Sequence, residues 1–177
     1  MNIFLIGYRC SGKTSVGRSL ATRLGWPFID TDSELVGEHG ASISDIVQEQ
    51  GWEAFREMER AVIKRVSALD GYVVATGGGA VLESGNVEQM KTSGVLVWLR
   101  ANPPTIEKRM LKDQNTGDFR PALTAKGLIL EVEETLEYRH SFYENAANFF
   151  IDTDEIRIDK ICGDLLEKLT DSFPIRS

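Results

Sequence analysis

The stretch FLIGYRCSGKTSVG, residues 4–17, decides the fold, because an apolar run, a glycine-bounded turn and a helical pattern follow one another within it. Its segment GYRCSGKT matches G-x-x-x-x-G-K-[ST], a phosphate-binding loop when it lies between a strand and a helix. Gly7 and Gly12 allow backbone angles that a side chain would obstruct, so the N–H groups between them can surround phosphate oxygens. Lys13 supplies a charge for the outer phosphates, and Thr14 supplies a hydroxyl for Mg²⁺. The alternative is an ordinary glycine turn, but pattern, strand and helix agree on a nucleoside triphosphate site.

Short apolar runs and longer helical patterns alternate along the rest of the chain. The apolar runs predict five strands, at 3–6, 27–30, 72–75, 95–99 and 148–151. Helical patterns cover 13–24, 44–69 with a break near Gly51, 84–92, 104–112, 128–145 and 154–170. This alternation predicts a single α/β domain in which a parallel sheet lies between two layers of helices. The polar segment 112–127 interrupts the pattern as an exposed loop, of a length that is usually functional or disordered.

The composition is that of a globular protein, with 42% hydrophobic and 27% charged residues and a net charge of −7. A pI of about 4.9 argues against a general nucleic-acid binder, which would carry a basic surface. Apolar runs such as VLVWL at 95–99 are too short to span a membrane, and no signal-peptide pattern is visible. Cys10 and Cys162 give no disulfide framework. We therefore expect a cytoplasmic protein without nucleic-acid or membrane partners.

Two carboxylates, Asp30 and Asp32, follow the second predicted strand in the segment FIDTDSE. Ligands of open α/β sheets bind beyond the carboxyl ends of the strands. In such a place Asp30 can hold Mg²⁺ or its waters, and Asp32 can accept the proton of a hydroxyl that receives a phosphoryl group. The alternative, which the segment favours when it is taken alone, is an Asx turn in which Thr31 or Asp32 caps the next helix.

Two arginines on predicted helices are candidates for binding an anion. In GWEAFREMER, Arg56 and Glu59 are three residues apart, so the glutamate can fix the guanidinium for two parallel hydrogen bonds to a carboxylate. Arg139, in LEYRHSFYENAA, is a candidate for a second clamp. The alternatives are a solvated surface ion pair and a solvated helix arginine. His140 has no nucleophile beside it in the pattern, and we interpret it as a surface or packing residue.

Three further features surround the predicted site. The run Gly77–Gly79 in VVATGGGAV allows a ligand to approach bare backbone, although a flexible turn is the alternative. Arg120, in DFRPAL, can cover a bound nucleotide and stabilise charge on the transferring phosphoryl group, unless it is a plain exposed loop arginine. Arg109 precedes that loop and is a candidate for stacking on an adenine base.

In their order and spacing, the blocks GYRCSGKTSVG, FIDTD, GWEAFREMER, TGGGAV, FRPAL and EYRHSFYENAA resemble the shikimate kinase family over nearly the whole chain. The resemblance implies transfer of the γ-phosphoryl group of ATP to the 3-hydroxyl of shikimate, in aromatic amino-acid biosynthesis. It implies a P-loop fold similar to that of nucleoside monophosphate kinases, with sheet order 2-3-1-4-5. Residues 1–177 would then form one kinase domain, with a substrate-binding helical segment at about 31–60 and a mobile lid at about 112–126. We expect it to work as a monomer.

The resemblance also implies a role for each candidate residue. The residues it places on ATP are Cys10, Ser11, Gly12, Lys13, Thr14, Ser15, Arg109 and Arg120. The residues it places on shikimate are Asp32, Arg56, Gly77, Gly78, Gly79 and Arg139, with both arginines on the carboxylate. It implies catalytic roles for Lys13, Asp32 and Arg120, and binding of Mg²⁺ by Thr14 and Asp30.

Two positions depart from the family pattern. Many members have glycine where this chain has Cys10, and Ala122 replaces the first leucine of the common lid sequence RPLL. Neither residue supplies an obligatory side chain. The alternatives are a gluconate kinase or another small-metabolite kinase with the same phosphate loop, and a nucleotide-binding module without catalysis. The combination of Asp32 with two anion-binding arginines argues against the second alternative.

Overall fold

Five parallel strands form one sheet in the order β2-β3-β1-β4-β5. The structure is a computed structural model that describes residues 1–112 and 128–173. The strands are β1 (Asn2–Ile6), β2 (Phe28–Asp30), β3 (Val73–Ala75), β4 (Gly94–Arg100) and β5 (Phe149–Asp152). The predicted strands, their parallel arrangement and the order 2-3-1-4-5 are confirmed.

The helices agree with the predicted patterns, with two differences. They are α1 (Lys13–Leu24), α2 (Thr31–His39), α3 (Ile43–Ser67), the short 3-10 helix η1 (Ala80–Leu82), α4 (Ser84–Ser93), α5 (Pro103–Lys112), α7 (Leu128–Ala146) and α8 (Ile158–Ser172). The helical patterns do not include α2, because its polar sequence TDSELVGEH has little apolar periodicity, although α2 lies within the helical segment at about 31–60 that the family resemblance implies. Helix α8 begins later than the predicted residue 154, because Glu155 has a φ of 52°, which a right-handed helix cannot contain. The predicted break in α3 is confirmed at Gly51, with φ 84° and ψ 169°.

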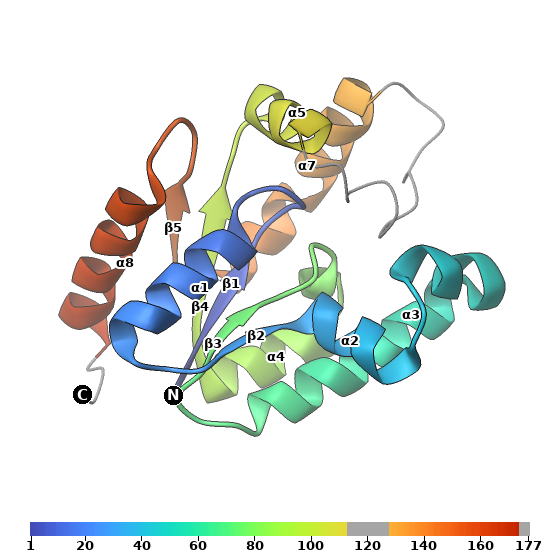
Figure 1. Cartoon of the computed structure of the whole chain (residues 1–177), viewed down its shortest axis with the longest axis horizontal. Coiled ribbons are helices and arrows are strands. Elements are labelled where there is room, and N and C mark those ends of the chain that lie inside the picture. The colour runs from blue at the N-terminus through green and yellow to red at the C-terminus, as the bar shows by residue number, and fades with distance from the viewer. Residues whose placement is uncertain (113–127, 174–177) are drawn as a thin grey trace.

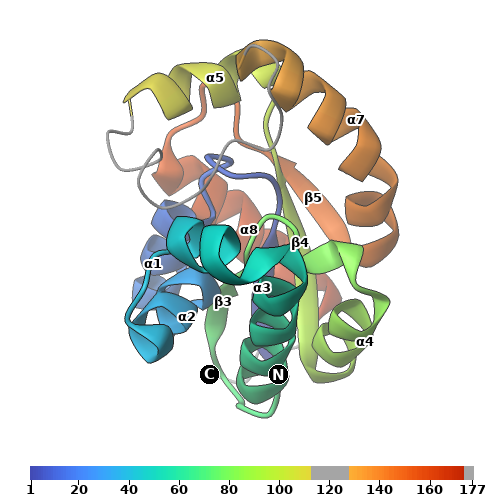
Figure 2. The same ribbon diagram turned by 90° about the vertical axis from the view of Figure 1, so that its right-hand side faces the viewer.

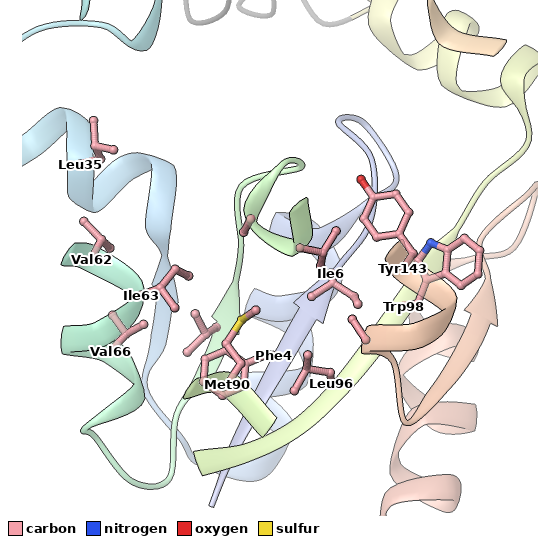
Figure 3. Packing of buried hydrophobic residues seen from close by; sticks show 14 of the residues in the cluster. Phe4, Ile6, Leu35, Val62, Ile63, Val66, Met90, Leu96, Trp98 and Tyr143 are labelled. Carbon is pink, nitrogen blue, oxygen red and sulfur yellow. The ribbon is translucent and has the colours of Figure 1, made fainter. Parts of the chain in front are cut away.

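The central strand β1 explains the three layers, because its buried side chains alternate between two faces of the sheet. Ile3 and Leu5 join the cluster beneath α1 and α8, and Phe4 and Ile6 join the cluster beneath α3, α4 and α7. Figure 1 shows α1 and α8 together on one side of the sheet, and Figure 2 shows α3 and α4 in front of the other side. In Figure 3, the stacked rings of Trp98 and Tyr143 join β4 to α7. Every central strand is therefore buried on both faces, as a parallel sheet requires.

One edge of this sheet collects the polar residues of the predicted site. Strand β1 ends at the phosphate loop, β2 ends at Asp30, and β3 ends just before Thr76 and the glycine run. Strand β5 ends just before Thr153. Because the strands are parallel, these ends lie at the same edge, where ligands of open α/β sheets bind. The predicted lid at 112–126, with Arg120 and Ala122, lies almost entirely outside the described residues.

Candidate active site

The phosphate loop joins β1 to α1 as the motif requires. Gly7 has a φ of 142°, and a Cβ atom there would lie 2.5 Å from the carbonyl oxygen of Leu99, so only glycine fits. The side chain of Lys13 is buried, and its Nζ donates hydrogen bonds to the carbonyl oxygens of Gly7 and Tyr8, both at 2.7 Å. The loop therefore curls around its own lysine, and its residues from Cys10 to Ser15 line a cavity of about 850 Å³.

Asp30 joins the phosphate loop to the start of α2. Its Oδ2 accepts a hydrogen bond from Thr14 Oγ1 at 2.7 Å, and its Oδ1 accepts from the backbone N–H groups of Asp32 and Ser33. The alternative for this segment, a helix cap, is confirmed in that a helix is capped here. The capping residue was predicted wrongly as Thr31 or Asp32, because it is the Asp30 side chain that accepts hydrogen bonds from the N–H groups of the first turn. A capping bond does not exclude a second role, since a carboxylate accepts several hydrogen bonds at once.

The Thr14 hydroxyl and the Asp30 carboxylate fit Mg²⁺ chemically, because both are hard oxygen ligands at the wall of the larger cavity. Within the described ranges, no group of three or more histidine, cysteine or acidic residues could hold a metal by itself. A magnesium ion at this position would therefore need phosphate oxygens and water as further ligands, which is its usual arrangement in phosphoryl-transfer sites.

A second cavity adjoins the first and contains every residue predicted to bind the acceptor. Its lining consists of Tyr8, Arg9, Asp32, Ile43, Trp52, Phe55, Arg56, Glu59, Gly77, Gly78, Gly79 and Arg139. Arg9, Asp32 and Ile43 line both cavities, so the two spaces meet at these side chains. The structure therefore brings together residues from α2, α3, α7 and the segments that follow β1 and β3, which are far apart in the sequence.

The pair Arg56–Glu59 is buried, so the alternative of a solvated surface pair is wrong. Arg56 Nη1 donates to Glu59 Oε2 at 2.6 Å, and the Glu59 side chain is only 2% exposed. Burial raises the pKa of Glu59, although the charge and hydrogen bond of Arg56 act in the opposite direction. The Arg56 guanidinium also lies 5.2 Å from the ring centre of Phe55. The guanidinium is thus fixed in one position at the wall of the second cavity.

The run Gly77–Gly79 approaches these charged groups too closely for side chains. A Cβ atom at Gly77 would lie 2.6 Å from Glu59 Oε1 and 2.9 Å from Asp32 Oδ1. A Cβ atom at Gly79 would lie 2.6 Å from Arg56 Nη1. A side chain at Gly77 or Gly79 would therefore displace the charged groups of the site, which a simple flexible turn would not explain.

Arg139, on α7, also lines this cavity. Its Nη1 donates to the carbonyl oxygen of Gly78 at 3.1 Å, and the hydroxyl of Tyr143 donates to the same oxygen at 2.6 Å. Its side chain is buried, so the alternative of a solvated helix arginine is wrong. Neighbouring His140 is exposed and lines neither cavity, as predicted for a surface or packing residue.

Arg109 lines the larger cavity and donates hydrogen bonds to two neighbouring segments of its wall. Its Nη1 donates to the carbonyl oxygen of Cys10 at 3.1 Å and to Thr153 Oγ1 at 3.2 Å, and its Nη2 donates to the Thr153 carbonyl oxygen at 2.5 Å. The Thr153 hydroxyl also lies 3.0 Å from the carbonyl oxygen of Ser11. Arg109 therefore ties α5 to the phosphate loop, and its contact with adenine stays a prediction.

Sequence reasoning missed two groups of the site. The variable positions of the phosphate-loop pattern carry no signal, so Tyr8 and Arg9 were not recognised as cavity residues. Thr153 was missed because a single threonine after a strand matches no motif.

Four buried atoms around the smaller cavity have no hydrogen-bond partner among the described residues: Tyr8 Oη, Arg9 Nε, Glu59 Oε1 and Arg139 Nε. Buried polar groups are rarely left unpaired, so this cavity fits a polar ligand.

Together, the sheet, the phosphate loop and the adjoining acceptor cavity define a P-loop kinase that phosphorylates a small molecule. Comparison with known proteins gives the particular family: the shikimate kinase family model matches residues 9–170, and the chain belongs to this family. The shikimate kinase of Syntrophus aciditrophicus is 41% identical over 175 residues, which cover 94% of this chain and 90% of that protein. The shikimate kinase of Symbiobacterium thermophilum is 40% identical, with 96% of each chain covered.

A solved structure agrees with these relatives. The shikimate kinase from Acinetobacter baumannii in complex with shikimate matches with a TM-score of 0.90 and 30% identity. The match covers 98% of this chain and 95% of that one. The predicted family, its kinase activity and its nucleoside-monophosphate-kinase-like fold are thus confirmed.

Proposed function

We propose that this protein transfers the γ-phosphoryl group of ATP to the 3-hydroxyl of shikimate. The observation that carries the proposal is the second cavity, in which two fixed guanidinium groups, a carboxylate and a glycine run surround a space beside a phosphate loop. Two arginines suit one carboxylate, and a carboxylate with bare backbone suits hydroxyl groups. The ligand named for the Acinetobacter baumannii structure, shikimate, has both kinds of group.

In this proposal, Arg56 and Arg139 bind the shikimate carboxylate, and Gly77–Gly79 contact the ring hydroxyls. Asp32 is near enough to Gly77 to share those hydroxyls, since only 2.9 Å separates its Oδ1 from the Cβ position there. Asp32 orients the reacting hydroxyl and accepts its proton as the new bond to phosphorus forms. A site that binds hydroxyls with charged partners strongly rejects analogues that lack them.

On the donor side, the loop residues from Cys10 to Ser15 hold the phosphates of ATP. Lys13 stays with the outer phosphates and stabilises the charge that develops during transfer. Thr14 and Asp30 are the residues that would hold Mg²⁺, which neutralises phosphate charge when it is bound. Arg120, outside the described residues, is proposed as the arginine that covers the nucleotide, on the family resemblance alone.

We further propose that the protein acts as a monomer in the cytoplasm. None of the helices in the described ranges combines the length and the apolar character that a membrane span needs.

A coupled assay of ADP release tests the function. We expect release with shikimate as acceptor, and little with gluconate or nucleoside monophosphates. Preference for gluconate would favour another small-metabolite kinase, and ATP binding without acceptor-dependent release would favour a non-catalytic module. Gel filtration with light scattering tests the monomer, because a dimer would double the mass from 19.7 kDa.

A further inference from the structure

We propose that Arg9 is a further catalytic residue, whose guanidinium contacts the phosphoryl group as it passes from ATP to shikimate and then stays with the phosphate of the product. This inference rests on the proposed function and deepens it. It concerns a variable position of the phosphate-loop pattern, to which the motif assigns no role.

The position of Arg9 is the first argument. Of the described residues that line the two cavities, only Arg9, Asp32 and Ile43 line both. A group that moves from the nucleotide cavity into the acceptor cavity must pass these three side chains. Ile43 is apolar and Asp32 is negative, so Arg9 is the cation at the junction.

The way in which Arg9 is held is the second argument. Its Nη2 donates to Oε1 of Glu131 on α7, and the side chains of Arg9 and Glu131 are only 10% and 3% exposed. This buried ion pair fixes the guanidinium without using all five of its N–H donors. Its Nε has no hydrogen-bond partner among the described residues, so phosphoryl oxygens would satisfy a donor that is otherwise buried and unpaired.

Arg9 and Arg139, one of the two arginines that we place on the carboxylate, both lie near the ring of Tyr8. The guanidinium carbon of Arg9 lies 5.7 Å from the centre of this ring, and that of Arg139 lies 5.9 Å from it. Arg139 donates to Gly78 in the acceptor cavity, whereas Arg9 is held at the junction by Glu131. Two cations with different anchors fit two anionic groups, the carboxylate and the transferred phosphate.

The charge balance of the reaction gives the third argument. The bond between the γ-phosphorus and the oxygen that bridges it to the β-phosphate breaks, a bond to the 3-hydroxyl oxygen forms, and the hydroxyl proton goes to Asp32. The product phosphate then lies beside the residue that bound the hydroxyl, at the boundary between the cavities. Lys13 approaches it from the nucleotide side, and Arg9 adds the second cation. Arg9 donates hydrogen bonds throughout and transfers no proton.

The test compares binding of shikimate with binding of shikimate 3-phosphate in the variant Arg9→Gln. Trp52 lines the acceptor cavity and is 41% exposed, so its fluorescence reports occupancy by either ligand. We expect the Kd of shikimate 3-phosphate to rise about ten- to hundredfold and kcat to fall by a similar factor, because charged hydrogen bonds are lost. The Kd of shikimate should change by less than about threefold, within the range of a neutral contact. Arg9→Lys should recover part of both losses, because it keeps the charge.

Two controls make the result decisive. Arg23→Gln removes an exposed arginine that pairs with Asp159 and should leave every constant unchanged. Arg9→Gln removes the ion pair between Arg9 and the buried Glu131, so the double variant Arg9→Gln/Glu131→Gln is measured as well and should show the same selective loss.

Equal weakening of both ligands would overturn the inference, because Arg9 would then belong to the carboxylate clamp. Unchanged constants in a folded variant would overturn it as well. A wild-type protein without shikimate-dependent ADP release would instead refute the proposed function, so the two failures are distinguishable.

Discussion

Replacing Gly79 by alanine should damage shikimate binding without damaging the fold. Gly79 has φ −106° and ψ 0°, a conformation that alanine can adopt. The added Cβ atom would lie 2.6 Å from Arg56 Nη1, whereas real Cβ contacts almost never fall below 3.0 Å. The guanidinium is the far end of a flexible side chain, so it should move and leave the backbone in place.

The magnitude follows from the bonds that this movement breaks. Arg56 would leave both Glu59 and the shikimate carboxylate, and hydrogen bonds to charged groups contribute about 1.5–3 kcal/mol each. Loss of one such contact corresponds to a rise in KM of about 10- to 150-fold. The KM of ATP should change little, because Gly79 does not line the nucleotide cavity.

Initial rates of ADP release are measured at a series of shikimate concentrations and at a series of ATP concentrations, and they give the two KM values. Gly85→Ala is the matched control, because a Cβ atom there meets nothing within 4 Å. Thermal unfolding should show both variants folded. If G79A bound shikimate as well as the control did, the assignment of the carboxylate to Arg56 would be refuted.

Three other substitutions test separate parts of the site. Asp32→Asn should abolish phosphoryl transfer while ATP binding, measured by calorimetry, stays near wild type; normal turnover would remove Asp32 from the mechanism. Cys10 has a φ of 57° and Cys10→Gly should relieve left-handed strain of about 1–2 kcal/mol, offset by the greater backbone entropy of glycine. Urea unfolding should therefore find the variant within about 1 kcal/mol of wild type, and a larger loss would mean that the thiol packing dominates. Because burial raises the pKa of Glu59, the folded state binds its proton more tightly, so wild type should gain stability relative to Glu59→Gln as the pH falls from neutral toward the ordinary glutamate range. A pH-independent difference between the two free energies of unfolding would contradict that pKa shift.

Local patterns made most of this fold predictable. The phosphate loop, the strand ends and the break at Gly51 depend on residues that are neighbours in the sequence, and the structure confirms them. The order of the motif blocks then predicted which residues share the acceptor cavity. Only the tertiary structure could show that Arg56–Glu59 is buried, because spacing on a helix does not reveal which face is covered.

Other features depend on contacts between distant segments, and no sequence pattern reports them. Arg9 and Glu131 are 122 positions apart, and neither residue lies in a pattern that implies the other. The cap of α2 was assigned to the wrong residue because several polar side chains near a helix start can all act as caps, and geometry selects Asp30. The positive φ at Cys10 favours glycine at this loop position, which agrees with the expectation from the family resemblance that many members have glycine there.

The carbonyl groups of the glycine run have a consequence for inhibitor design. Gly77 and Gly79 accept from the backbone N–H groups of Ala80 and Leu82, and the Gly78 oxygen already accepts from two side chains. With both of its lone pairs used, the Gly78 carbonyl has no capacity for a ligand hydroxyl. The N–H group of Gly77 also donates within the protein, to Thr31 Oγ1 at 3.0 Å. An ammonium group in place of a ring hydroxyl should thus bind poorly beside Gly78, whereas a compound that offers a donor to Asp32 should keep that contact.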